Sequence, residues 1–313
     1  MGFFDKLKKG KRQNEPEKQA NPEQPPKIDY ITSPGGIFMV QLLMKEKCDM
    51  PSNERFVEVL SKHLGDVEQF GDRKVLASFA AKDYISQFKD GSTPVTLMIS
   101  DCDAFASEKI DDFQRSQMWS CREDRDRILS ECKYQILAND TMGGGQPPQV
   151  RANMLMDYLE ALMELYPQCE AVYILNSGKL VQADEIRAKK ATGLERFIQY
   201  AVNVRFFNIQ GTEDSIVDTI GLGLLFIEDL QYHFHGKLHD LDPNYVVGHA
   251  YSMASYLLNN NNPIKDGGTI DGIRDGALVQ DIQWKCRYEE SIVQPTRPVI
   301  DVCMGEYAAG NRG

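Results

Sequence analysis

The sequence predicts an α+β fold in which a mixed or antiparallel sheet packs its helices mainly on one face. Three observations support this prediction. From residue 33 onward, apolar residues recur alternately at every second position, as in a strand, and at three or four positions, as in a helix. Hydrophobic residues make up 42% of the 313 residues and charged residues 26%, which is typical of globular proteins. The first thirty positions are poor in hydrophobic side chains, so we expect disorder there.

The N-terminal tail and the rest of the chain differ in charge. Residues 1–28 carry seven basic and four acidic side chains, a net charge of +3, whereas the remainder carries 28 basic and 42 acidic, a net charge of −14. We expect residues 1–32 to form a disordered basic tail and a proline-rich linker. Residues 33–313 then form one α+β domain, which can be divided into two related sub-halves, 33–145 and 146–313, because strands, a helix and strands recur in the last third.

In the first third of the body, the pattern predicts the order β-α-β-α-β. Residues 36–44 (GIFMVQLLM) are typical of a buried strand. A helix follows that Ser52 or Asn53 caps and Gly65 ends, with apolar residues at spacings of three and four between them. The next predicted elements are a strand at 74–79, a short helix at 82–88 and a strand at 94–100.

The remainder contains the two strongest helical patterns, residues 124–138 and 150–166, separated by the breaker run GGGQPP at 143–148. A hairpin is expected next, with its turn at Asn176-Ser177-Gly178. The other predicted elements are strands at 171–175, 179–181, 202–209 and 220–227, a helix at 243–258, and strands at 269–273 and 281–288.

Four of the five histidines lie within seventeen residues, 233–249. His233 and His235 are two positions apart, so on a strand they would point to the same face, and a nearby aspartate could complete a ligand set for a divalent metal such as zinc. The candidate metal ligands are His233, His235, His249, Asp240 and Asp242. No H-E-x-x-H spacing is present, and structural histidines are the simpler interpretation.

Other motifs do not predict catalysis or cofactor binding. The glycine run at 143–145 follows a helix and leads into two prolines, which is the wrong context for a phosphate-binding loop. Asn176 to Lys179 is interpreted as a hairpin turn, and Cys286 as a small core residue on a strand. We therefore predict no catalytic residue and no cofactor, apart from the metal alternative.

The net charge and the spacing of the cysteines indicate which partners and which cellular compartment to expect. The net charge of −11 repels phosphate backbones, so nucleic acid is not expected as a partner. The seven cysteines are widely spaced, without a C-x-x-C pair, and we found no signal peptide or membrane-spanning run, which predicts a cytoplasmic protein. Residues 1–12 (MGFFDKLKKGKR) could make at most peripheral contact with an anionic membrane, and a solvated tether is the simpler interpretation.

Six short strings resemble the bacterial family of domain of unknown function 4261, over roughly Gly36 to Asn311. They are RSQMW at 115–119, CKYQ at 132–135, AVNVRFF at 201–207, LQYHFH at 230–235, NPIKDG at 262–267 and QWKC at 283–286. The resemblance implies an α+β domain without an established activity, and it assigns no residue a role. Residues 236–239 look like an insertion relative to the family pattern, which makes His239 the weakest metal ligand.

Two functions follow from these observations. We expect a non-catalytic protein-binding or scaffold module whose acidic surface engages another protein. The reasons are that we identify no set of catalytic residues in the sequence, and that the basic tail and the acidic body have opposite charge. The alternative is a metal-dependent hydrolase that uses His233, His235 and His249, in which the ion would make a bound water nucleophilic.

Overall fold

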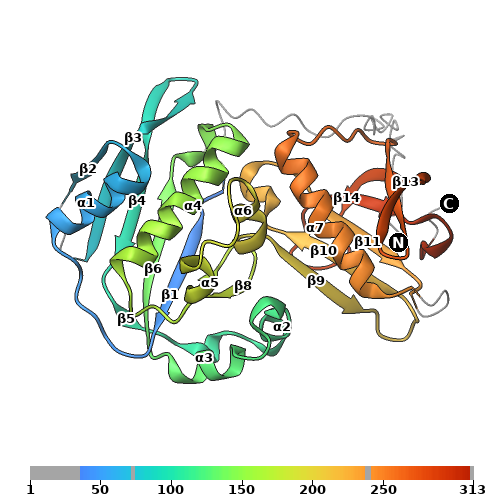
Figure 1. Cartoon of the computed structure of the whole chain (residues 1–313), viewed down its shortest axis with the longest axis horizontal. Helices are drawn as coiled ribbons and strands as arrows, with labels where there is room; N and C mark the ends of the chain where they lie inside the picture. Colours follow the sequence, from blue (N-terminus) through green and yellow to red (C-terminus); the bar gives the residue numbers. More distant parts are fainter. Residues whose placement is uncertain (1–35, 72–74, 237–240, 311–313) are drawn as a thin grey trace, which may run out of the picture.

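The computed structural model of the chain describes residues 36–71, 75–236 and 241–310 (Figure 1). Within these ranges, fourteen strands form two sheets with helices packed on them, which confirms the predicted α+β class. The predicted tail, residues 1–32, lies outside the described residues. No helix in the described part of the chain is both long and apolar enough to cross a membrane.

Sheet A contains the first eight strands of the described chain. Seven of them lie in the order β2-β3-β4-β6-β1-β7-β8, each antiparallel to its neighbours, and β5 also pairs with β6. The strands are β1 (Met39–Met44), β2 (Val67–Phe70), β3 (Leu76–Phe88), β4 (Gly91–Ser100), β5 (Asp103–Ala104), β6 (Tyr134–Thr141), β7 (Ala171–Ile174) and β8 (Lys179–Gln182).

Sheet B contains the remaining six strands, in the order β12-β13-β14-β11-β10-β9. Its β11 and β14 are parallel, and its other neighbours are antiparallel. The strands are β9 (Asn203–Asn208), β10 (Ser215–Ile220), β11 (Asp229–Phe234), β12 (Thr269–Arg274), β13 (Ala277–Glu290) and β14 (Pro298–Cys303). β12 is therefore an edge strand, with β13 as its partner.

Most of the helices cover one side of the two sheets. α1 and α4 pack against each other over sheet A, α7 packs on β9, β10 and β11, and α4 also contacts α6 and α7 (Figure 1). Their apolar side chains share one core with both sheets. The α-helices are α1 (Asn53–Leu64), α2 (Asp112–Ser116), α3 (Arg125–Glu131), α4 (Pro148–Leu165), α5 (Ala183–Arg187), α6 (Glu195–Tyr200) and α7 (Pro243–Asn259).

A second, smaller core lies on the opposite face of sheet A. It contains Leu43 of β1 and Tyr173 of β7, together with Ile128 and Leu129 of α3. Leu43 follows Leu42, which belongs to the main core, and successive side chains of a strand point to opposite faces. Sheet A is thus covered on both faces near β1 and β7.

Local sequence signals explain the first helix well. The Ser52 hydroxyl accepts a hydrogen bond from the Arg55 amide (3.2 Å), as an N-cap does. The buried residues Phe56 and Leu60 are four positions apart and face the core. Gly65 ends the helix with φ of 81°, a conformation that glycine adopts without strain. The predicted helix is confirmed.

The two sheets contain one unit in common. In sheet A, β1-α1-β2-β3-β4 runs along the chain, and in sheet B the same order recurs as β11-α7-β12-β13-β14. β14 lies directly beside β11, whereas β6 is inserted between β4 and β1. The change from sheet A to sheet B falls between Gln182 and Asn203, later in the chain than the sub-half boundary at 145/146 that the sequence suggested.

Two predicted helical segments are strands. Residues 82–88 were predicted to be a helix but continue β3, where Ile85 to Phe88 pair with Pro94 to Gly91 of β4 after a bulge. Residues 132–138 were predicted to extend the helix that starts at 124, but α3 ends at Glu131 and β6 begins at Tyr134. In both segments, pairing with distant strands outweighs a local helical pattern.

The strand predicted at 220–227 is also wrong. β10 ends at Ile220, and Leu222–Leu225 form a 3₁₀-helix, η4. The Asp229 carboxylate accepts hydrogen bonds from the amides of Leu222 (3.2 Å) and Gly221 (3.4 Å), which turns the chain away from the sheet. Gly221 has φ of 135°, and a Cβ there would lie 2.8 Å from a backbone oxygen, so the turn requires glycine.

Candidate functional site

The structure brings two of the candidate metal ligands together. His233 and His235 of β11 both contact the carboxylate of Asp214: Nε2 of His233 lies 3.2 Å from Oδ2, and Nδ1 of His235 contacts Oδ1. Asp214 directly precedes β10, which pairs with β11. The sequence prediction did not include Asp214, because it placed the strand at 220–227 and so left this residue in a loop.

His249 lies on the other side of sheet B. It belongs to α7 and contacts Tyr232, whose side chain points away from that of its neighbour His233. Its Nε2 lies 2.9 Å from the Asp271 carbonyl oxygen and therefore donates, so Nδ1 accepts from the Tyr232 hydroxyl at 2.9 Å. Burial lowers the pKa of His249, which favours this neutral ring. Neither nitrogen keeps a lone pair for a metal.

The two predicted aspartate ligands do not join the histidines in the described structure. The Asp242 carboxylate caps α7 by accepting from the Asn244 amide at 2.9 Å. Asp240 and His239 lie outside the described residues. Among the residues that are described, no group of three or more His, Cys, Asp or Glu side chains could hold a metal ion.

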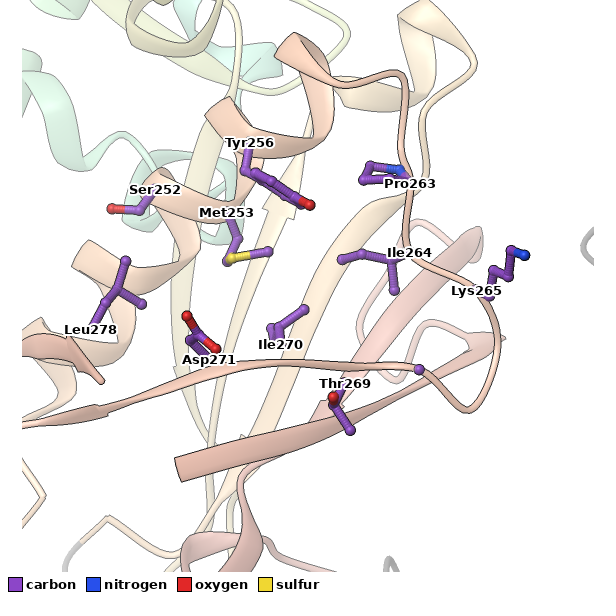
Figure 2. Close-up of a pocket in the computed structure, with 11 residues that line it drawn as sticks. Ser252, Met253, Tyr256, Pro263, Ile264, Lys265, Thr269, Ile270, Asp271 and Leu278 are labelled. Carbon is purple, nitrogen blue, oxygen red and sulfur yellow. The ribbon is translucent and has the colours of Figure 1, made fainter. Parts of the chain in front are cut away.

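The feature that sequence reasoning missed is an open cavity between α7 and the edge strand β12, with a volume of about 520 Å³. Figure 2 shows side chains from both elements and from the preceding loop turned toward it. Its lining includes Ser252, Met253 and Tyr256 of α7, Ile264 and Lys265 of the loop, Thr269, Ile270 and Asp271 of β12, and Leu278 of β13. We call this cavity the α7–β12 groove.

The α7–β12 groove has an apolar floor, and its rim carries two large apolar side chains. Met253 and Ile270 are each only 7% exposed and form part of the floor. Tyr256 and Leu278, at the rim, are 46% and 53% exposed. Large apolar side chains that remain exposed beside a cavity are typical of a binding surface.

The edge strand turns part of its backbone toward α7. The Gly268 carbonyl accepts from the Cys286 amide of β13 (2.8 Å), whereas the Asp271 carbonyl accepts from His249 of α7 (2.9 Å). Backbone groups alternate in direction along an antiparallel strand. Thr269, like Asp271, therefore directs its amide and carbonyl away from β13, on the side where the groove lies.

The loop from α7 to β12, which forms the remaining border of the groove, is hydrogen-bonded to β13. The Gly267 amide donates to the Cys286 carbonyl at 2.8 Å, and the Tyr288 hydroxyl donates to the Ile264 carbonyl at 2.8 Å. These bonds tie the loop from α7 to β12 onto β13. The groove is thus preformed, which lowers the entropic cost of binding a ligand.

Comparison with known families matches residues 218–303 to the family model described as Domain of unknown function (DUF4261). This segment belongs to the DUF4261 family. It runs from β10 to β14 and includes the whole α7–β12 groove. Of the six strings that carried the resemblance, those at 230–235, 262–267 and 283–286 fall within the match, and the other three precede it. No curated protein and no solved structure matches the chain.

Cys286 of the DUF4261 segment is a core residue, as the sequence predicted. Cys286 is fully buried on β13, and burial raises the pKa of its thiol to about 12. It therefore stays protonated at neutral pH and is a poor nucleophile. Its amide and carbonyl instead anchor the loop at the border of the groove.

Gly272 of the DUF4261 segment gives a prediction for the groove's architecture. A Cβ there would lie 2.5 Å from Ile282 Cγ2 and 2.9 Å from Trp284 Cε2, at the bulge of β12. We expect Gly272→Ala to lower the free energy of unfolding by about 1–3 kcal/mol, because the buried indole cannot retreat. Urea denaturation measures this effect.

The matched control is Gly248→Ala in α7, where an added Cβ meets no atom within 4 Å. This change should raise the free energy of unfolding by about 0.5–1 kcal/mol, because alanine favours a helix. Equal effects of the two substitutions would contradict the packing that we describe around Trp284.

Proposed function

We propose that the chain is a non-catalytic protein-binding module of the bacterial cytoplasm, which holds an extended segment of a partner protein in the α7–β12 groove. The observation that carries this proposal is the position of the cavity beside β12, which is an edge strand among the strands that the structure describes (Figure 2). An edge strand offers backbone donors and acceptors to an incoming chain, and an adjacent apolar cavity accepts its alternate side chains. The groove combines both features.

The lining suggests what the partner segment contains. Met253 and Ile270 at the floor suit one or two aliphatic or aromatic side chains, and a cavity of about 520 Å³ has room for them. The chain outside its first 28 residues carries a net charge of −14, so basic residues flanking the apolar ones would be attracted to it. The proposed ligand is an extended, apolar segment with basic flanks.

Selection from a displayed library of random peptides tests this proposal. We expect the selected peptides to combine apolar and basic residues, and we expect Leu278→Glu to weaken their binding by about tenfold or more, because a carboxylate then stands at the apolar rim. Fluorescence anisotropy of one labelled peptide measures the affinity. The matched control is Ile85→Glu, an exposed apolar residue on β3 of sheet A, which should leave binding unchanged.

A second pair of variants separates strand addition from simple burial of side chains. Thr269→Pro removes an amide that points away from β13, and should abolish peptide binding, whereas Thr269→Ala keeps the amide and should bind normally. Circular dichroism checks that both variants fold. Selected peptides that bind Leu278→Glu and folded Thr269→Pro as tightly as the native protein would refute the proposal.

The competing proposal is a metal-dependent hydrolase. The observation in its favour is that His233 and His235 meet at the Asp214 carboxylate. His249 would not take part, since both of its nitrogens are engaged elsewhere. Zinc that stays bound at one equivalent after dialysis, and that Asp214→Ala releases, would favour the hydrolase. Zinc that washes out of the native protein would exclude it.

A further inference from the structure

A second cavity lies beside α7, where helices over the two sheets meet. Its volume is about 690 Å³. It is bounded by β8 of sheet A and by helices that include α7, which packs on sheet B. Its lining includes Ser120 of the 3₁₀-helix Trp119–Cys121, Lys179 of β8, Glu185 of α5, Glu195 and Gln199 of α6, and Tyr251 and Ser255 of α7. Junctions of this kind are frequent locations of ligand sites.

The floor and the rim of this cavity differ in exposure. Ser120, Glu195 and Gln199 are exposed, so the cavity opens to solvent between them. Lys179, in contrast, is only 2% exposed. The lysine thus lies at the inner end of a cavity whose entrance is polar.

The position of the Lys179 amine is well defined. Its Nζ donates a hydrogen bond to the Val202 carbonyl oxygen at 2.7 Å and lies 5.6 Å from the centre of the Tyr251 ring. Burial lowers the pKa of Lys179 to about 7, and the nearby Glu185 carboxylate offsets this effect in part. At neutral pH a large fraction of the amine is therefore unprotonated and nucleophilic.

We propose that Lys179 is the nucleophile of a covalent binding site for a small, uncharged, hydroxylated aldehyde or ketone. The hydroxyl, amide and carboxylate groups of Ser120, Gln199, Glu185 and Glu195 can bind the hydroxyl groups of such a compound. The two carboxylates repel anions, which excludes phosphorylated and carboxylated carbonyl compounds. This site is separate from the α7–β12 groove and does not depend on the function proposed for it.

The reaction is Schiff-base formation. The Nζ lone pair attacks the carbonyl carbon, the C–N bond forms as the carbonyl π bond breaks, and the carbonyl oxygen takes one proton from the nitrogen to give a carbinolamine. The C–O bond then breaks, the hydroxyl leaves as water with one proton from the nitrogen, and an imine remains. No oxidant or reductant is needed. When protonated, the imine keeps one N–H, which the Val202 carbonyl can still accept.

Reductive trapping tests the proposal on the full chain. The protein is incubated at pH 7 with glyceraldehyde and sodium cyanoborohydride, which converts an imine into a stable secondary amine, and peptide mapping by mass spectrometry locates the adduct. We expect Lys179 to be modified faster than the exposed Lys265 by on the order of tenfold or more, because burial lowers the pKa of the Lys179 amine to about 7 and the cavity binds the aldehyde beside it.

The controls distinguish a site from a merely reactive amine. Glyceraldehyde 3-phosphate should modify Lys179 more slowly than glyceraldehyde does, and Lys265→Arg should leave the Lys179 adduct unchanged. Glu195→Gln should reduce the preference for the uncharged aldehyde, because it removes one of the two repelling carboxylates. Adducts spread over surface lysines with Lys179 unmodified would overturn the proposal, as would equal rates for the two aldehydes.

Discussion

Asp218→Ala should lower the free energy of unfolding by about 3–5 kcal/mol, because it removes the only carboxylate paired with the buried Arg205 of β9 among the described residues, and one of the two paired with Arg297. Asp218 is fully buried on β10. It accepts from Nε of Arg205 at 2.9 Å and from Nη2 of Arg297 at 2.7 Å. Arg205 is itself buried, and Arg297 is mostly so. Removal of the acid leaves the buried Arg205 guanidinium without a carboxylate, whereas Arg297 keeps its ion pair with Asp229 (3.3 Å). A buried charge without a partner is strongly destabilising.

Chemical denaturation at neutral pH measures this loss. The matched control is Asp184→Ala, which breaks the ion pair to Arg187 (2.9 Å) at a side chain that is 89% exposed. We expect an effect of at most about 0.5 kcal/mol there, because solvent screens exposed pairs. Equal losses of unfolding free energy for Asp218→Ala and Asp184→Ala would contradict this prediction. The buried ion pairs would then contribute little to holding β9, β10 and the segment before β14 together.

Local signals predicted the helices that carry the groove and the core. Asp242 and Pro243 mark the start of α7, and Ser52 and Gly65 mark the ends of α1, because caps act through neighbouring backbone groups. The same local information could not identify β6. Its residues owe their conformation to β4 and β1 on either side, and those partners lie far away in the sequence.

The candidate sites were harder to predict than the fold. The two-residue spacing of His233 and His235 indicated that both side chains share one face of the strand. Both contact Asp214, but this contact depends on the register of β10 against β11, which the sequence does not reveal. In sequence, Met253 and Ile270 look like ordinary core residues. They line a groove because β12 is an edge strand, and edge position is a property of the whole sheet.

The burial of Lys179 could likewise not be predicted from the sequence around it. In the sequence it follows Asn176-Ser177-Gly178 and is typical of a hairpin turn, which the structure contains between β7 and β8. Nothing nearby in the sequence indicates that its amine is buried, because α6, α7 and the Val202 carbonyl enclose it from positions farther along the chain. Burial is the cause of its lowered pKa.

The stability of the protein should therefore depend on pH through Lys179. Its pKa is about 7 in the folded protein and has the ordinary value of 10.5 when the chain unfolds. Between these values the unfolded chain binds more protons, so the contribution of Lys179 to stability rises with pH through this window and is flat below pH 7. The slope is about 1.4 kcal/mol per pH unit, or roughly 5 kcal/mol over the window.

Lys179→Met removes this dependence, because methionine fills similar space without a titratable group. We expect the free energy of unfolding of the native protein, minus that of Lys179→Met, to increase steadily between pH 7 and 10, as measured by urea denaturation. Glu185 and Glu195 line the same cavity, and burial raises the pKa of Tyr251, whose ring faces the amine. The exposed Lys265→Met serves as the control and should show no such slope. A flat difference for Lys179→Met would mean that the amine keeps its proton in the folded state, and the Schiff-base site would then lack its nucleophile at neutral pH.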